Sequence, residues 1–393
     1  MRIKLKDLGT FGNGAQRPKY DGSVPVYGGN GILGWSNQSN YPAGTIIIGR
    51  VGAYCGSVFL ALERCWVSDN AIAFCPNDQC NSLFLAYYLK LINLNSFHIG
   101  SSQPLITQEI IGNIEIDLPC CEVQTSIAKT LSSIDSKIDN NNAICADLEG
   151  MAKLLYDYWF VQFDFPDENG KPYKSSGGKM VWNEELKREI PEGWETVIIG
   201  NISKANRGVS YSGDNLASEG TPMLTLGFAN KDGSFNTNGI QSVQGIDDKN
   251  KYISPYDLVM YNTDMSALKH VIGRTILVPP LYEHCYSSHH LTTISFEDTQ
   301  LKWLFYYLTQ TEFFRKYIKG FATGTNVIGL DYRGVEDFCM AVPTQEVLNK
   351  FVQVSIYVEK IKGNVLKENV ELSSLREFLL PMLMNGQVKV KGA

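Results

Sequence analysis

The sequence predicts an α/β (α+β) fold in which two long antiparallel coiled-coil helices join two similar globular domains. The same order of sequence features occurs twice along the 393 residues, which indicates a pseudo-two-fold internal repeat. A seam of apolar residues follows each copy with the alternating spacing of four and three that is typical of coiled coils. A composition of 44% hydrophobic and 19% charged residues is that of a folded chain.

Seven short segments of the first copy have counterparts in the second copy. The pairs are 3–9 with 197–202, 24–26 with 221–223, 41–48 with 253–260, 67–72 with 286–291, 83–89 with 302–308, 100–106 with 322–328 and 116–119 with 340–343. The second copy is longer, and its extra residues are expected in surface loops, where insertions cost little free energy.

The residue pattern of each copy predicts a globular domain of short strands with one helix between them. β-branched runs such as Thr45–Ile48 and Arg274–Val278 are bounded by Gly and Pro, which is typical of strands. Aromatic-rich segments at 83–91 and 303–317 predict one short helix in each globule. The predicted boundaries are 1–118 for the first globule, 119–165 for the first long helix, 166–193 for a linker, 194–342 for the second globule, 343–386 for the second long helix and 387–393 for a tail.

Two long helices are predicted from the apolar seams. The first seam runs from Ile127 to Trp159 with Asn141 as its plainly polar member, and the second runs from Val347 to Leu379 with Glu368 as its charged member. We expect the helices to pack on each other within the chain, as a rod of roughly 55 Å at ~1.5 Å per residue. The polar members are commonly devices that set the register. Ordinary core helices of larger domains are the alternative.

The motifs of common enzyme classes are absent from the sequence. It has no phosphate-binding loop, no H-E-x-x-H, no G-x-S-x-G and no clear G-x-G-x-x-G that opens a helix. Nine cysteines form no C-x-x-C pair, and the adjacent His289 and His290 are expected on opposite faces of a strand. We therefore predict no catalytic residue, no metal and no cofactor. The sequence shows no signal core and no apolar run long enough to span a membrane, so we expect a cytoplasmic protein.

The charge distribution is unusual for a protein that binds a nucleic acid. The formal net charge is −6, and basic residues do not outnumber acidic residues in either globule. A protein that binds a duplex alone normally carries a basic surface that neutralises phosphates. If this chain reads DNA, a partner must therefore supply much of the positive charge.

The stretch from the end of the first predicted long helix to the start of the second globule resembles a known family. It contains Tyr156-Asp-Tyr-Trp-Phe-Val-Gln-Phe-Asp-Phe-Pro166, then a Gly- and Lys-rich stretch to Trp182, and then Pro191-Glu-Gly-Trp194. This region is similar to the central conserved region of the specificity subunit of Type I restriction-modification systems, in which Pro-Glu-Gly-Trp opens the second target-recognition domain. Phe378-Leu-Leu-Pro-Met-Leu-Met-Asn-Gly386 resembles the distal conserved helix end. The first copy lacks a Pro-Glu-Gly-Trp motif.

The resemblance implies a DNA-reading subunit with no catalysis of its own. Each target-recognition domain is expected to read one half of a bipartite, gapped site in double-stranded DNA, with the helices as spacer. The implied partners are two copies of an adenine-N6 methyltransferase subunit, which dock on the helices, and a restriction endonuclease/translocase subunit. The aromatic segment after the first seam exceeds what a two-helix seam needs, so its residues are predicted to bind a methyltransferase. They are Tyr156, Trp159, Phe160 and Phe163.

Candidate base-reading residues lie in polar loops that correspond between the two copies. Arg pairs with guanine and Asn or Gln with adenine in the major groove. In the first globule the candidates are Asn30 in a Gly-rich loop, Arg50 in a Gly-Arg-Val-Gly turn, and Ser101, Ser102 and Gln103. In the second globule they are Arg207, Ser210, Tyr211, Ser266, Lys269, His270, Thr323, Thr325 and Asn326. Each of these residues is equally compatible with a plain role in a turn.

Three other functions remain open at this stage. The chain is also compatible with a specificity subunit whose single partner both methylates and cleaves, with a degenerate stand-alone adenine methyltransferase, and with a coiled-coil scaffold that does not bind DNA. Binding of S-adenosylmethionine by the isolated chain distinguishes the enzyme. Exchange of the second globule distinguishes the scaffold, whose partners would not respond to it.

Overall fold

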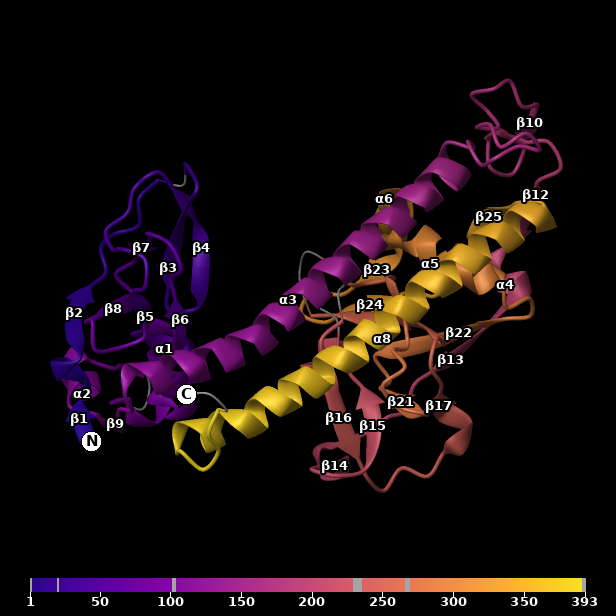
Figure 1. The fold of residues 1–393 in the computed structure, drawn as a ribbon. Coiled ribbons are helices and arrows are strands. Elements are labelled where there is room, and N and C mark those ends of the chain that lie inside the picture. Colours follow the sequence, from indigo (N-terminus) through magenta and orange to yellow (C-terminus); the bar gives the residue numbers. More distant parts are fainter. Residues whose placement is uncertain (1, 20, 101–103, 229–234, 266–268, 391–393) are drawn as a thin grey trace. The chain divides into compact units, whose positions relative to one another are not determined.

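The chain forms two compact units in the computed structural model, which describes residues 2–19, 21–100, 104–228, 235–265 and 269–390 (Figure 1). One unit comprises residues 1–139 and 370–393, and the other comprises residues 140–369. Two long helices, α3 (Cys121–Tyr156) and α8 (Gln345–Met384), each contribute to both units. Each unit therefore contains one globule and a segment of both helices.

The globule of the first unit contains three small sheets and two short helices. The strands are β1 (Arg2–Lys4), β2 (Gly9–Asn13), β3 (Val24–Gly28), β4 (Gly31–Ser36), β5 (Ile46–Gly49), β6 (Val58–Leu60), β7 (Trp66–Val67), β8 (Ala71–Pro76) and β9 (Glu115–Asp117). The sheet orders are β1-β9, β2-β8-β5-β6 and β4-β3-β7. Among these strand pairs of the described residues, β3–β7 is parallel and the others are antiparallel. Helix α1 (Ser82–Leu91) is capped by the side chain of Asn81, and α2 (Gln108–Gly112) precedes β9.

The globule of the second unit repeats this plan with additions. Its strands are β12 (Glu195–Ile198), β13 (Ser203–Arg207), β14 (Leu216–Ala217), β15 (Thr221–Leu224), β16 (Ile240–Val243), β17 (Tyr252–Ile253), β18 (Leu258–Tyr261), β19 (Thr263–Asp264), β20 (Thr275–Leu277), β21 (Cys285–Ser287), β22 (Leu291–Phe296), β23 (Ala322–Thr323), β24 (Ile328–Leu330) and β25 (Cys339–Val342). The sheet orders are β12-β25, β13-β22-β18-β20, β14-β16-β15-β21-β17 and β19-β24-β23. Its helices are α4 (Ile199–Ile202), α5 (Leu301–Gln310), α6 (Glu312–Ile318) and α7 (Arg333–Glu336).

The strand pairing confirms the internal repeat. The sheet β2-β8-β5-β6 has the same order and the same antiparallel pairs as β13-β22-β18-β20. The parallel pair β3–β7 corresponds to β15–β21, and the terminal pair β1–β9 corresponds to β12–β25. Isolated bridges of the first globule, Tyr41–Cys65, Val51–Leu105 and Ile99–Leu105, stand where β17–β21, β19–β24 and β23–β24 pair in the second.

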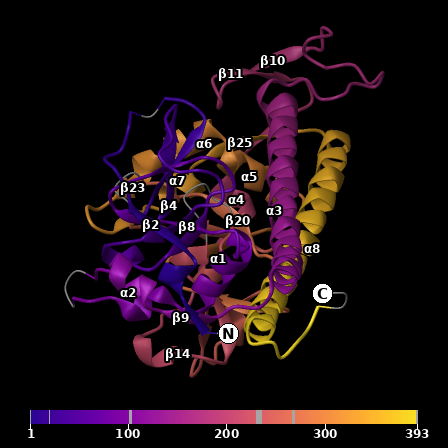
Figure 2. The ribbon, with the colours of Figure 1, turned by 60° about the vertical axis from the view of Figure 1, so that its left-hand side comes forward.

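The long helices run antiparallel within each unit (Figures 1 and 2). In the first unit, Asp135 of α3 pairs with Arg376 of α8 at 2.7 Å and also accepts a hydrogen bond from Tyr87. In the second unit, Glu149 of α3 lies 3.8 Å from Lys362 of α8. As residue numbers rise along α3, they fall along α8, so the two helices are antiparallel.

The two polar exceptions of the seams contact each other. Asn141 is 1% exposed, and its amide donates to Glu368 at 2.8 Å and to Asn369 at 2.8 Å. Asn369 in turn donates to Asn142 at 2.9 Å. A buried polar layer of this kind fixes the register of two helices, because a slip would leave its groups without partners.

Some helix predictions need correction. Val354 and Leu375, which the spacing placed in the second seam, are 41% and 45% exposed. The single helix predicted over 303–317 is two helices, because Thr311 ends α5 and its hydroxyl accepts the backbone N–H of Phe314 as the N-cap of α6.

Candidate nucleic-acid interface

The candidate loops of the first unit meet at one end of the β2-β8-β5 part of its sheet. The backbone N–H of Arg50, directly after β5, donates to the carbonyl of Asn70 at 3.0 Å, and the N–H of Ile106 donates to the carbonyl of Arg50 at 3.0 Å. A Cβ atom on Gly29 would lie 3.3 Å from the Asn70 carbonyl. The loops that carry Asn30, Arg50 and Asn70 are therefore neighbours.

The side chains at this end of the first unit are polar and accessible. Asn13, Asn30 and Asn70 are exposed, and Arg50 is half-buried. The side-chain oxygen of Asn13 accepts a hydrogen bond from Gln108 at 2.7 Å. The Arg50 side chain has no hydrogen-bond partner among the residues that the structure describes. Its guanidinium can therefore bind an external acceptor without first breaking a described contact.

The second unit has a corresponding cluster at the ends of β13, β18 and β21. Arg207 is exposed, and its Nε donates to the carbonyl of His289 at 2.8 Å. The amide nitrogen of Asn262 donates to Thr292 at 2.9 Å and to the His289 carbonyl at 3.3 Å. The side-chain oxygen of Asn262 accepts a hydrogen bond from Thr263 at 3.1 Å. Asn262 is thus fully engaged, whereas the two Nη groups of Arg207 remain available among the described contacts.

Two histidines lie beside Arg207. The ring centroids of His289 and His290 are 3.9 Å apart, and the ring of Tyr211 is 6.0 Å from that of His289. The expectation that the two histidines point to opposite faces is wrong, because they lie in the turn after β21 and not in a strand. Burial, His289 and Arg207 all lower the pKa of His290 below its usual value of 6.5. A neutral imidazole both donates and accepts, which suits a base edge better than a phosphate.

Lys269 and His270, predicted to contact DNA, make hydrogen bonds to other residues of the second unit. The Lys269 ammonium donates to the carbonyls of Lys319 at 3.2 Å and Ala322 at 2.9 Å. Arg315 donates to the carbonyl of His270 at 2.6 Å. Lys269 is therefore attached to the start of β23. Contact of either residue with DNA stays a prediction.

The other predicted residues divide into exposed and undescribed ones. Ser210 is exposed and Tyr211 is half-buried after β13. Thr323 at the end of β23 and Thr325 and Asn326 in the loop that follows are exposed. That loop adjoins the cluster, because the N–H of Leu330 donates to the Asn262 carbonyl at 2.9 Å. Four predicted residues lie outside the described residues, namely Ser101, Ser102, Gln103 and Ser266.

The aromatic residues predicted to bind a partner are buried inside the second unit. Exposure is 4% for Tyr156, 8% for Trp159, 8% for Phe160 and 1% for Phe163. The ring of Phe160 lies 4.7 Å from that of Phe351 in α8, and the ring of Phe163 lies 5.3 Å from that of Trp194. These side chains pack at the end of the helix pair, where Tyr156, Phe160 and Phe163 also line a pocket, so their contact with a partner stays a prediction.

The segment that follows α3 does expose other apolar side chains. Tyr158 is 39% exposed and Val161 is 46% exposed. Arg188 of the strand β11 (Arg188–Pro191) donates to the Val161 carbonyl at 3.2 Å and its guanidinium lies 4.6 Å from the centre of the Phe163 ring. The hairpin of β10 (Met180–Asn183) and β11 is thereby attached to this segment.

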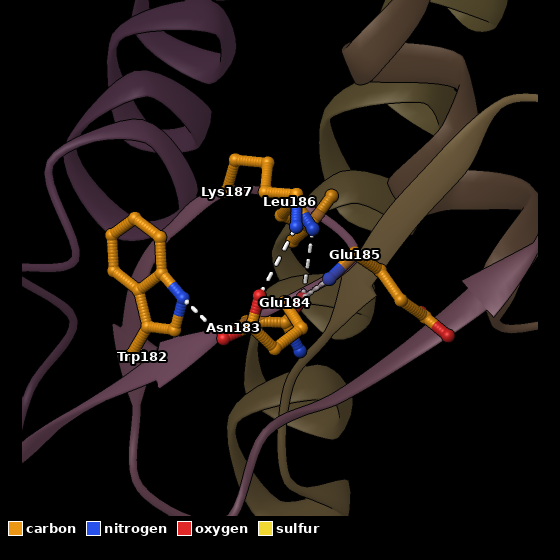
Figure 3. Close-up of polar contacts among 6 residues, drawn as sticks. All are labelled: Trp182, Asn183, Glu184, Glu185, Leu186 and Lys187. Atoms are coloured by element: carbon orange, nitrogen blue, oxygen red, sulfur yellow. Dashed lines mark hydrogen bonds and ion pairs between the residues drawn. The ribbon is translucent and has the colours of Figure 1, made fainter.

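Strand β10 of this hairpin carries Trp182 next to the turn (Figure 3). Its indole is 58% exposed and donates to Glu184 at 3.0 Å. The side-chain oxygen of Asn183 accepts the backbone N–H groups of Glu185 at 3.1 Å and Leu186 at 2.9 Å (Figure 3). Lys187 adopts a φ of 52°, in the left-handed region that closes tight turns. These bonds attach the exposed Trp182 side chain and Asn183 to the turn that follows β10.

Sequence reasoning missed three residues of these clusters, Asn13, Asn70 and Asn262. Strand pairing identifies them, because it shows which residues of the two copies occupy equivalent positions. Alignment of short apolar segments does not give this residue-by-residue correspondence. Across the described ranges, no group of three or more His, Cys, Asp or Glu side chains could hold a metal ion. No helix in the same ranges is long and apolar enough to cross a bilayer.

Comparison with known proteins supports this arrangement. Residues 1–150 and 191–331 match the family described as Type I restriction modification DNA specificity domain. The chain is 26% identical over 358 residues to the Type I restriction enzyme MjaIX specificity subunit of Methanocaldococcus jannaschii, which covers 89% of this chain and 79% of that protein. It is 21% identical to the HindI specificity subunit of Haemophilus influenzae, over 72% of this chain and 71% of that one.

A solved structure shows the same fold. The S subunit of a Type I restriction-modification system from M. genitalium superposes with a TM-score of 0.61 over 98% of this chain and 95% of that chain, at 16% identity. Specificity subunits recognise the DNA target, are non-catalytic, and partner the methyltransferase and restriction subunits. The repeated fold and the two matched regions together show that this chain belongs to the specificity-subunit family of Type I restriction-modification systems.

Proposed function

We propose that each globule reads one half of a bipartite, gapped site in double-stranded DNA. The observation that carries this proposal is the repetition of one polar loop cluster, around Arg50 in the first unit and around Arg207 in the second. Two equivalent reading sites on one chain suit a target with two parts. The helices that contribute to both units form the connection between the two readers.

The partners are part of the same proposal. Two adenine-N6 methyltransferase subunits dock on the chain, one for each copy of the repeat, and a restriction endonuclease/translocase subunit completes the complex. Since the chain has a net charge of −6, the methyltransferase subunits supply most of the contacts to phosphates. The specificity subunit then contributes the contacts to base edges.

Exchange of one globule tests the bipartite reading. Residues 194–342 are replaced by the corresponding domain of another family member, and the sequences methylated by the assembled complex are mapped by sequencing. We expect one half-site to change completely and the other to stay as it was, because the two clusters belong to different units. Exchange of residues 1–118 is the matched control and should change the other half-site. A target that is unchanged after both exchanges contradicts the proposal.

The exposed apolar residues near the hairpin are the proposed contact with a methyltransferase. Exposed aromatic side chains are enriched at protein interfaces, and their truncation at a hot spot costs about 2 kcal/mol or more. Trp182→Ala is expected to weaken assembly by roughly 30-fold in Kd, measured by titration of the methyltransferase subunit. Trp35→Ala, which removes a tryptophan that is 48% exposed in the first unit, is the control. Equal affinities of both variants and the parent chain would exclude this contact.

A further inference from the structure

The two clusters share one backbone framework, which gives an exact correspondence of positions. The N–H of Arg50 donates to the carbonyl of Asn70, and the N–H of Asn262 donates to the carbonyl of His290 at 3.1 Å. The carbonyl of Arg50 accepts from Ile106, and the carbonyl of Asn262 accepts from Leu330. Arg50 and Asn262 therefore occupy the same position, directly after the equivalent strands β5 and β18.

A second pair of equivalent positions lies at the ends of β2 and β13. The N–H of Gly14 donates to the carbonyl of Ala71 at 3.3 Å, and the N–H of Gly208 donates to the carbonyl of Leu291 at 3.0 Å. Asn13, which precedes Gly14, therefore corresponds to Arg207. The strand registers agree, since Asn13 pairs with Ile72 and Arg207 pairs with Thr292.

The same two residue types occupy these positions in reverse order. The first unit has Asn at the end of β2 and Arg at the end of β5, and the second unit has Arg at the end of β13 and Asn at the end of β18. In each unit the Asn side chain bonds to the protein, Asn13 to Gln108 and Asn262 to Thr292. Each unit thus presents one arginine fork, from one of two neighbouring places on a common backbone.

We propose that Arg50 and Arg207 are specificity-determining residues that each read a guanine, one in each half-site. This assignment rests on the proposed function. An arginine fork donates to the O6 and N7 atoms of guanine in the major groove. Since β2 and β5 both flank β8, their ends lie about 10 Å apart, or about three base-pair steps at 3.4 Å. Relative to the globule that reads it, the guanine of one half-site is therefore expected about three base pairs away from the position that the guanine of the other half-site occupies.

Single substitutions in the full complex test the assignment. Arg50→Lys keeps the charge and removes the bidentate fork, so we expect non-specific DNA affinity to persist while the preference for guanine at one position of one half-site falls by roughly 5- to 150-fold. Arg207→Lys should do the same in the other half-site only. The readout is the set of sequences methylated in a random-sequence plasmid library. Arg64→Lys and Lys204→Ala, at exposed positions in the two units, are the controls.

A reciprocal variant tests the exchanged placement. Asn13→Arg combined with Arg50→Asn gives the first unit the arrangement of the second, and we expect its guanine preference to move by about three base pairs while the other half-site stays unchanged. If the lysine variants and the reciprocal variant keep every base preference of the parent complex, the assignment is overturned and the bipartite reading stands. If the parent complex shows no two-part target, the proposed function itself fails.

Discussion

Phe351→Ala is expected to lower the free energy of unfolding of the second unit by about 3–5 kcal/mol. The Phe351 ring is 1% exposed and lies 4.7 Å from the ring of Phe160, 5.5 Å from that of Tyr307 and 5.9 Å from that of Tyr156. Truncation leaves a cavity at the point where α3, α8 and α5 meet, and it also removes edge-to-face ring contacts. The loss of unfolding free energy should therefore be near the upper end of the range for substitutions in a protein core.

Chemical denaturation of the full chain measures this effect, with hydrogen exchange assigning the change to one unit. Phe378→Ala is the matched control, because Phe378 lies on the same helix and is 60% exposed. Its effect should stay within about 0.5 kcal/mol. Similar losses for the two variants would show that the aromatic cluster does not stabilise the helix junction.

Gly208→Ala is expected to destabilise the second unit by about 1–3 kcal/mol and to abolish recognition of one half-site. A Cβ atom on Gly208 would lie within 3.0 Å of the carbonyl oxygens of Ser287 and Ser288. Both oxygens belong to backbone, so the strand end itself must move. That strand end carries Arg207, and a displaced arginine loses its geometry toward a base.

Thermal unfolding and mapping of methylated sequences measure the two effects. Gly213→Ala is the control, because a Cβ atom there would meet no atom within 4 Å. Gly14→Ala should produce the same loss in the first unit, where the added atom would lie within 3.0 Å of the Ser68 carbonyl. If the Gly208→Ala complex still methylates the parent target, the close approach of Gly208 to the Ser287 and Ser288 carbonyls is not required for DNA recognition.

The sequence predicted those parts of the fold that repeat regularly. The spacing of apolar residues predicted α3 and α8 and their packing on each other, because coiled-coil positions recur every seven residues. It also identified Asn141 and Glu368 as exceptions, which the structure shows in contact. The split between α5 and α6 was missed because Thr311 acts through a local cap, which the aromatic periodicity hides.

The site was harder to predict, because it depends on contacts between distant segments. Arg50 and Arg207 were identified as polar loop residues, yet their relation follows only from the backbone hydrogen bonds of Arg50 to Asn70 and of Gly208 to Leu291. The aromatic segment from Tyr156 to Phe163 was predicted to bind a partner. Its burial depends on Phe351 and Trp194, which lie far away in the sequence and close it from two sides.

The aromatic junction also gives the protein an optical probe of its own. Trp159, Trp194 and Trp303 are 7–8% exposed, and all three belong to the second unit. Indole emission moves to longer wavelength when the ring passes from apolar surroundings into water. The emission of these three indoles therefore reports on unfolding of the second unit, and no dye or label is needed to follow it.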